Sequence, residues 1–240
     1  MTTLAGVRSF APSQSNSMKL VRYSEADLPT VHGPFRLFVY HEVGEQNEAG
    51  STDSWHMAIV RGPIRGKHQV LTRVHSECWT SEVMGSLKCD CREQFHAAME
   101  KIAAEGAGVL VYLRQEGRGI GLGNKIRAYA LQDSGADTVE ANLALGFEAD
   151  ERSYDIAGAI LRDLDVLSVR LMTNNPLKVK GLEDAGVTVA DRVSHWVGEN
   201  QHNAGYLSVK RHKMGHHPDA KKPEPLDPIP VLRAVPKPKA

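Results

Sequence analysis

The strongest constraint on the fold is an alternation of short apolar runs with amphipathic segments. Runs rich in apolar and β-branched residues, typical of strands, lie at 35–43, 56–62, 69–75 and 108–114. Helical periodicity is found at 92–106, 124–135 and 154–166. The stretch 168–189 has the pattern of a strand, a turn, a helix and a second strand. This order predicts an α/β fold, in which a mixed sheet with flanking helices follows a β-rich N-terminal part.

Three residues mark helix ends within this pattern. Gly106 follows the first helical segment and is a plausible C-cap, because glycine adopts the left-handed conformation without strain. Asn175 and Pro176 have the side chains of an N-cap and of a first helical residue.

The two ends of the chain differ from its middle. Residues 1–18 are small and polar without apolar periodicity, so we expect a disordered extension. Residues 217–240 hold seven of the 12 prolines, which favours a flexible, extended tail. A single catalytic domain is therefore predicted at 19–216.

Composition excludes several classes of protein. Lys plus Arg and Asp plus Glu both number 29, so there is no basic excess of the kind that binds nucleic acid. We expect no membrane span, because no apolar run reaches about 18 residues. The N-terminus lacks the apolar region of a secretory signal. Three cysteines cannot all pair with one another, so the sequence favours a reduced cytoplasm and thiols that serve a metal or catalysis.

All three cysteines lie within fourteen positions, with the spacing C-x10-C-x-C. Cys89 and Cys91 flank Asp90 and would point the same way in an extended segment, and the loop before them is long enough to bring Cys78 alongside. Three thiolates suit zinc, and a water in the fourth position is the mark of a catalytic site. Alternatives are a closed structural site with His75 as fourth ligand, or three unliganded buried thiols.

Three further segments carry candidate binding groups, each with a plainer alternative. The glycine-rich stretch 114–125 places Glu116 to accept hydrogen bonds from guanine and Arg118 to bind phosphate, unless it is only a tight turn. Acids at 148–153 precede a helix and commonly just complement its dipole. The turn at 173–178 forms a plausible anion site, or an ordinary helix cap.

Taken together these segments are far more specific than any one alone. The motifs "RVHSEC", "KCDC", "QEGRGIGL", "NKIRAYALQD", "DTVEAN", "DER" and "TNNP" occur in an order that resembles GTP cyclohydrolase II, the first enzyme of riboflavin synthesis. The resemblance extends from about residue 20 to residue 216.

The resemblance implies a role for each matched position. The implied zinc ligands are Cys78, Cys89 and Cys91. The implied GTP-binding residues are Arg73, Val74, His75, Ser76, Glu77, Gln94, Glu116, Gly117, Arg118, Thr138, Thr173 and Lys178. The implied catalytic residues are Asp150 as proton acceptor, Arg152 as nucleophile, and Tyr129 in completing the second hydrolysis. The chemistry of guanidinium instead favours a phosphate clamp for Arg152, because the group has no readily available lone pair.

The implied activity is hydrolysis of GTP at C8 with release of formate and pyrophosphate. The product is 2,5-diamino-6-ribosylamino-4(3H)-pyrimidinone 5′-phosphate, magnesium is used alongside zinc, and the proteins are typically homodimers. Two alternatives stay open. One is a diverged paralogue that stops at the formylamino intermediate or acts on another nucleotide. The other is a non-catalytic, zinc-stabilised binding protein.

Overall fold

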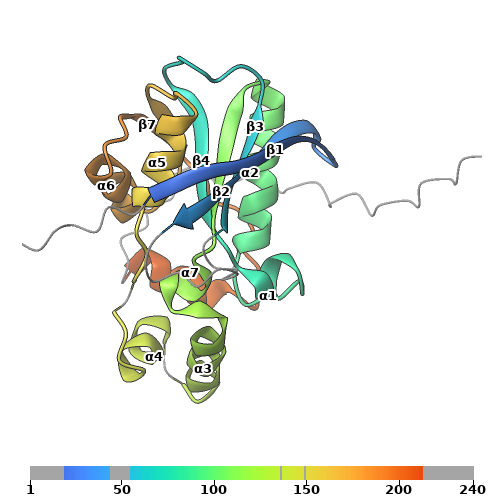
Figure 1. Cartoon of the computed structure of the whole chain (residues 1–240). Coiled ribbons are helices and arrows are strands. Elements are labelled where there is room, and N and C mark those ends of the chain that lie inside the picture. Colours follow the sequence, from blue (N-terminus) through green and yellow to red (C-terminus); the bar gives the residue numbers. More distant parts are fainter. Residues whose placement is uncertain (1–18, 44–54, 136, 149, 213–240) are drawn as a thin grey trace, which may run out of the picture.

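A seven-stranded mixed sheet forms the centre of the fold, with strands in the order β1-β2-β3-β5-β4-β6-β7 (Figure 1). The structure is a computed structural model that describes residues 19–43, 55–135, 137–148 and 150–212. The predicted extension at 1–18 and tail at 217–240 lie outside these residues. The strands are β1 (Lys19–Thr30), β2 (Gly33–Val43), β3 (Trp55–Arg61), β4 (Val70–Ser76), β5 (Gly108–Leu113), β6 (Val169–Met172) and β7 (Val189–Val193).

The sheet has an antiparallel half and a parallel half. Strands β1, β2, β3 and β5 pair antiparallel in that order. Strands β5, β4, β6 and β7 pair parallel. The predicted mixed sheet with a β-rich N-terminal part is thereby confirmed. The parallel half matters for function, because the carboxyl ends of its strands meet at one edge, where open α/β sheets bind ligands.

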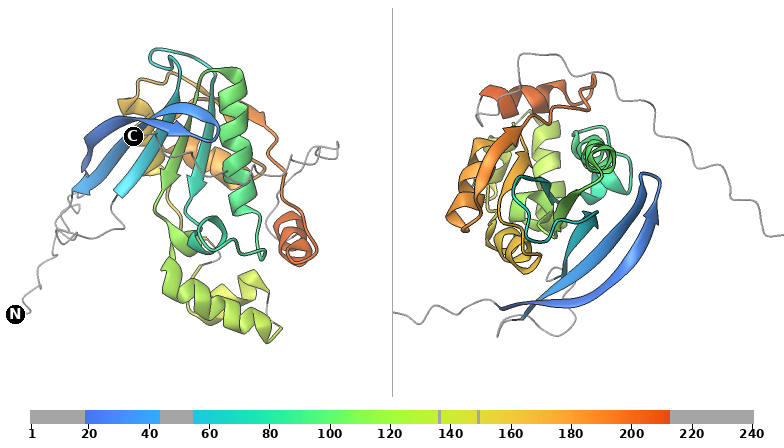
Figure 2. Two further views of the ribbon diagram at one scale, coloured as in Figure 1. Left: turned by 90° about the vertical axis from the view of Figure 1, so that its right-hand side faces the viewer. Right: turned by 90° about the horizontal axis from the view of Figure 1, so that it is seen from above.

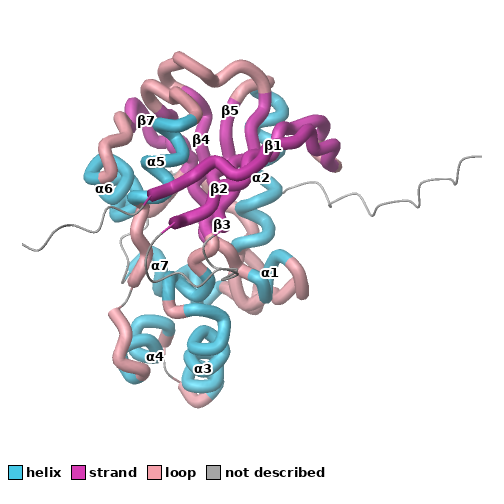
Figure 3. Tube along the Cα trace, viewed as in Figure 1, coloured by secondary structure: helices cyan, strands magenta, loops and turns pink. Residues whose placement is uncertain are grey.

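Helices cover both faces of the parallel half. The helices of the described residues are α1 (Trp79–Glu82), α2 (Cys91–Glu105), α3 (Gly121–Asp133), α4 (Thr138–Ala144), α5 (Asp155–Asp163), α6 (Pro176–Asp184) and α7 (Ala204–His212), with a 3-10 turn, η2, at Glu116–Gly119. In Figures 1 and 3, α2 lies on one side of the strands and α5 and α6 on the other, while α3 and α4 form a separate layer beyond the end of the sheet. Figure 2 shows the same separation from a second direction.

The alternation of side chains along β5 divides the core in two. Val109 and Val111 are fully buried in the cluster that contains Ile160 of α5. Leu110 lies between them in sequence and is buried in the other cluster, beside Ile102 of α2. Because successive strand residues point to opposite faces, a continuous apolar run indicates a strand covered on both sides.

The predicted helix ends are confirmed. Gly106 adopts a left-handed conformation, with φ of 79°, at the end of α2. Asn175 caps α6 by accepting a hydrogen bond from the Leu177 amide at 2.9 Å, and Pro176 is the first helical residue. Strand β1 was not predicted, and most of its side chains are exposed. None of the described helices is both long and apolar enough to cross a membrane.

Candidate active site

A cavity lies at the carboxyl ends of β4, β5 and β6, and most of the predicted site residues line it. Those that do are Arg73, His75, Ser76, Glu77, Cys78, Cys89, Cys91, Gln94, Glu116, Gly117, Arg118, Tyr129, Arg152, Thr173 and Lys178. These residues are spread over more than one hundred positions of sequence, and the parallel strands bring them together. The structure therefore places the predicted metal ligands and the predicted nucleotide-binding segment around one space.

Three predicted residues are not in the lining. The Val74 side chain is fully buried in the core, and its carbonyl oxygen accepts a hydrogen bond from Lys178 Nζ at 2.7 Å. Asp150 lies behind Arg152, to which it is paired. Thr138 begins α4, and its side chain lies outside the described residues.

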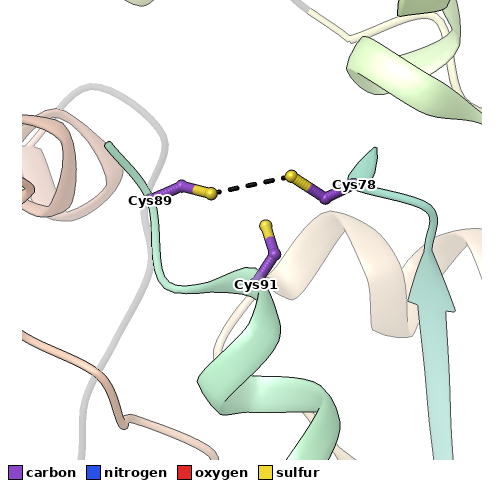
Figure 4. Close-up of side chains that lie close together, drawn as sticks. All are labelled: Cys78, Cys89 and Cys91. Carbon is purple, nitrogen blue, oxygen red and sulfur yellow. Dashed lines mark hydrogen bonds between the residues drawn. The ribbon is translucent and has the colours of Figure 1, made fainter. Parts of the chain in front are cut away.

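The three thiols converge beyond the carboxyl end of β4 (Figure 4). Their sulfur atoms all lie within 4.8 Å of one another, and those of Cys78 and Cys89 are 3.6 Å apart. A tetrahedral ion with Zn–S bonds of 2.3 Å separates its sulfur ligands by about 3.8 Å. The donor set and its spacing therefore fit zinc.

The local backbone differs from the sequence prediction. Cys89 and Cys91 do not lie in an extended segment, because Asp90 has φ of −111° and ψ of 14° and Cys91 is the first residue of α2. The thiols still point toward one another, because the chain bends just before the helix. The shared direction that strand alternation predicted is thus produced by a helix start.

His75 is not a ligand in this arrangement. Its Nε2 lies 2.7 Å from Glu82 Oε1, and the ring does not belong to the thiol group. Among the described residues, the three thiols form the one group of His, Cys, Asp or Glu side chains placed to hold an ion. Within the described part of the chain no further His, Cys, Asp or Glu side chain joins the thiol group, so the geometry does not support the closed structural site with His75.

Lys125 links the thiols to the glycine-rich turn, and the sequence analysis did not identify it. Its Nζ lies 3.1 Å from Cys78 Sγ and 2.7 Å from Glu116 Oε1. Hydrogen bonds from Cys89 and Cys91, together with the charge of Lys125, lower the pKa of the Cys78 thiol against the opposing effect of burial. The thiolate form that a metal requires is favoured.

The glycine-rich stretch forms a left-handed turn between β5 and α3. Gly117, Arg118 and Gly119 have φ values of 64°, 65° and 95°. Glu116 accepts hydrogen bonds from the backbone amide of Trp79 at 2.6 Å and from its neighbour Gly117 at 2.7 Å. Its carboxylate thus has protein donors at both oxygens, and its expected contact with guanine stays a prediction.

Asp150 and Arg152 form a two-pronged ion pair, of which Arg152 lines the cavity. Arg152 donates from Nε to Oδ1 at 2.7 Å and from a terminal nitrogen to Oδ2 at 2.5 Å. Burial opposes both charges, yet the pair keeps the pKa of Asp150 below its ordinary value and raises that of Arg152. The two hydrogen bonds hold the Arg152 guanidinium in a fixed plane beside Asp150, and its role as clamp or nucleophile stays a prediction.

A second arginine is fixed at the floor of the cavity. Arg73 is 6% exposed and donates to the Met172 carbonyl at 2.6 Å and to the side chain of Gln94. Gln94 in turn donates to Asp90 at 2.6 Å. Burial lowers the pKa of Arg73 to about 10, so it still carries its charge at neutral pH. Three guanidinium groups, those of Arg73, Arg118 and Arg152, and the Lys178 ammonium thus concentrate positive charge in the lining.

Other lining residues had no predicted role of their own. His195 and Asn142 are 1% and 3% exposed, and Tyr206 of α7 has the Arg118 guanidinium over its ring at 5.9 Å. Asn142 ends the motif DTVEAN, in which only Thr138 was singled out, and the fold was needed to place all three residues in the lining.

Comparison with known proteins decides the family. The model of the GTP cyclohydrolase II family matches residues 21–194. The chain belongs to the GTP cyclohydrolase II family. It is 53% identical over 201 residues to the GTP cyclohydrolase-2 of Aeromonas hydrophila, covering 84% of this chain and 98% of that protein. It is 52% identical over 204 residues to the GTP cyclohydrolase-2 of Pectobacterium atrosepticum, covering 85% and 100%.

A longer relative shares the same region. The riboflavin biosynthesis protein RibBA of Chlorobium phaeovibrioides is 49% identical over 214 residues, which are 89% of this chain and 50% of that protein. Among solved structures, RibBX, a two domain 3,4-dihydroxy-2-butanone 4-phosphate synthase from A. baumannii, is 20% identical over 77% of this chain and 41% of that chain, with a TM-score of 0.41. The family membership confirms the resemblance drawn from the motifs.

Proposed function

We propose that this protein hydrolyses GTP at C8 and releases formate and pyrophosphate, giving 2,5-diamino-6-ribosylamino-4(3H)-pyrimidinone 5′-phosphate in riboflavin biosynthesis. The observation that carries the proposal is the cavity in which a family-matched chain gathers three thiols, Arg73, Arg152 and the glycine-rich turn. A non-catalytic zinc protein would not need cationic side chains directed into an open cavity beside its metal ligands.

The proposed metal ligands are Cys78, Cys89 and Cys91, and the metal is zinc. Zinc held by these three thiolates would supply a water-derived nucleophile near neutral pH. The chain's own groups line the cavity beside the thiols. Tyr129 lies in the lining, and burial raises the pKa of its phenol, so it stays a protonated hydrogen-bond donor at neutral pH. We assign it to the second hydrolysis, which removes the formyl group.

The cations of the lining are proposed to hold the triphosphate. Arg152, fixed by Asp150, presents a planar fork that stabilises negative charge as pyrophosphate departs. Lys178 of α6 and Arg73 of β4 add positive charge to the lining, and we propose that Mg²⁺ accompanies the phosphates. Thr173 lies at the same edge, 1% exposed, and its hydroxyl accepts from the Asn175 amide at 3.1 Å.

We make three further proposals, on the location, the oligomeric state and the domain organisation of the protein. We place the enzyme in the cytoplasm, where its three free thiols stay reduced. We expect a homodimer, and exposed apolar side chains such as Val83 and Met84, 64% and 67% exposed, offer surface that a second copy would cover. We propose three parts: an N-terminal extension at 1–18, the catalytic domain at 19–216 and a flexible tail at 217–240.

Incubation of purified, zinc-loaded protein with GTP and Mg²⁺ tests the function. We expect formate, pyrophosphate and the diaminopyrimidinone phosphate, identified by mass. Predominant release of the formylamino compound would indicate the paralogue that stops early. No consumption of GTP, with turnover of another nucleotide, would indicate a changed substrate.

Substitution of one proposed ligand tests the role of the metal. Cys89→Ser should abolish formate release and reduce zinc below the expected one ion per chain, because serine is a poor ligand for a borderline-soft ion. The zinc content is read by metal analysis and the fold by circular dichroism. A folded, zinc-free protein that turns over GTP at the normal rate would contradict the proposal.

A further inference from the structure

Beside the cavity, the partly exposed carboxylate of Glu82 contacts a histidine whose second nitrogen has no hydrogen-bond partner among the described residues. Glu82 Oε1 lies 2.7 Å from His75 Nε2 and also accepts the Cys78 backbone amide at 3.1 Å. Its other oxygen accepts the Tyr112 hydroxyl at 2.6 Å. The Cys78 amide and the Tyr112 hydroxyl can only donate to the carboxylate, and the third neighbour is the His75 ring nitrogen. Glu82 is therefore the common acceptor.

The His75 ring is fixed in position as well as in contact. It stacks on Tyr112, with ring centroids 5.6 Å apart and an angle of 23°, and meets the edge of Phe95 at 5.5 Å. The residue is 2% exposed and lines the cavity, while Glu82 and Tyr112 do not. Its Nδ1 is buried without a hydrogen-bond partner.

These contacts determine where the imidazole carries its proton. A nitrogen that faces a carboxylate acceptor is the protonated one, so Nε2 donates and Nδ1 keeps a lone pair. Burial also lowers the pKa of His75, which favours the neutral ring. A buried acceptor without a donor is costly and calls for a partner that arrives with the ligand. Nδ1 does not serve the metal, because His75 lies outside the thiol group.

We propose that Glu82 is a positioning residue that fixes His75 with Nε2 protonated, so that Nδ1 accepts a hydrogen bond from an N–H or O–H group of the bound nucleotide. The inference rests on the function proposed above. Neither the metal-ligand spacing nor the motifs single out Glu82, which lies in the short helix α1 four positions after Cys78.

The tautomer is measurable without any turnover. ¹⁵N NMR of the zinc-loaded protein should show His75 as a neutral ring protonated at Nε2, with its signal assigned by loss in His75→Asn. A ring protonated at Nδ1 would overturn the proposal. If the protein failed to consume GTP, the proposed function would fall, and this measurement would still decide the tautomer.

Two substitutions of His75 separate its nitrogens. The amide oxygen of asparagine reaches the place of Nδ1 and can accept there, whereas the amide nitrogen of glutamine reaches the place of Nε2 and can donate to Glu82. We expect kcat/KM for GTP to be at least about tenfold higher in His75→Asn than in His75→Gln, the effect of roughly one hydrogen bond. Equal values, or the reverse order, would contradict the assignment of Nδ1 as the acceptor.

The same comparison identifies the nucleotide group. With 2′-deoxy-GTP the difference disappears if the donor is the 2′-hydroxyl, and with inosine triphosphate it disappears if the donor is the exocyclic amine. A difference kept with both assigns the donor to the ring N–H or the 3′-hydroxyl.

A double-mutant cycle tests whether Glu82 acts through His75. Glu82→Leu should lower kcat/KM by at least about tenfold in the natural chain and by less than about twofold in His75→Asn, with zinc content unchanged. Glu82→Gln keeps an acceptor oxygen for His75 and should stay within about threefold. Glu105→Leu is the control, because Glu105 pairs with Arg170 on the surface. If Glu82→Leu lowered kcat/KM by the same factor in His75→Asn as in the natural chain, or if it lost zinc, Glu82 would serve only the fold or Cys78. If Glu82→Leu does not fold, the His75 variants and the NMR spectrum decide.

Discussion

At the scale of single residues, the Asp150–Arg152 pair separates two roles for the arginine. Lysine keeps the charge but loses the planar fork that Asp150 holds at two points. A phosphate clamp should therefore retain weak activity in Arg152→Lys, about 10⁻² to 10⁻³ of normal, the usual effect of losing one oriented donor. Steady-state release of pyrophosphate measures it. Arg162→Lys is the control, because the Arg162 side chain is exposed, donates to the Ala185 carbonyl and does not line the cavity.

The alternative for Arg152 makes a different chemical prediction. A nucleophilic guanidinium must lose a proton before attack, and the pair raises its pKa instead. Rapid quenching at low temperature followed by mass spectrometry should find no phosphorus attached to Arg152. Isolation of a phosphoramidate at this residue would establish the nucleophile.

His195 makes stability depend on pH. Burial lowers its pKa well below 6.5, so the unfolded chain takes up the proton first as pH falls. The stabilisation is fully present above about pH 6.5 and is lost below it, at up to about 1.4 kcal/mol per pH unit. His195→Gln should reduce the slope of the unfolding free energy between pH 6.5 and 5.5, measured by denaturant unfolding of zinc-saturated protein. An unchanged slope would mean that His195 is not the group responsible.

At the scale of elements, the glycine turn positions the segment that carries Arg152. Gly119 has φ of 95°, and a Cβ there would lie 3.0 Å from the Glu151 carbonyl oxygen. Gly119→Ala should therefore cost about 1–3 kcal/mol of stability and lower kcat at least tenfold. Gly123→Ala is the matched control, because its Cβ meets nothing within 4 Å inside α3, and it should be neutral or stabilising by up to about 1 kcal/mol. Urea unfolding and GTP turnover distinguish the two; equal effects would mean that the turn has no special demand for glycine.

Elements with local signals were predictable from the sequence, and the others were not. Asn175 and Gly106 end helices through their own side chain or backbone, so the sequence alone identified them. Strand β1 is held by pairing with β2 rather than by a buried face, so it has little periodicity to detect. The thiol spacing indicated a shared site, but strand alternation was the wrong reason because α2 begins at Cys91. Lys125 acquires its contacts when α3 meets Cys78 and Glu116, and Glu82 acquires its contacts when α1 meets β4 and β5. No spacing in the sequence encodes either arrangement.

At the scale of the whole molecule, the cavity lining extends as far as α7, so activity should require the chain up to this helix. Tyr206 lines the cavity and Leu207 is 1% exposed, so this helix completes the wall. The proline-rich residues 218–240 follow it and match no part of the family model. Deleting 218–240 should change kcat/KM by less than about threefold, under roughly 1 kcal/mol of transition-state energy. Deleting 204–240 instead removes α7 and should abolish activity. A large loss from the shorter deletion, in protein that still folds by circular dichroism, would show that the tail closes over the cavity or joins two copies of the chain.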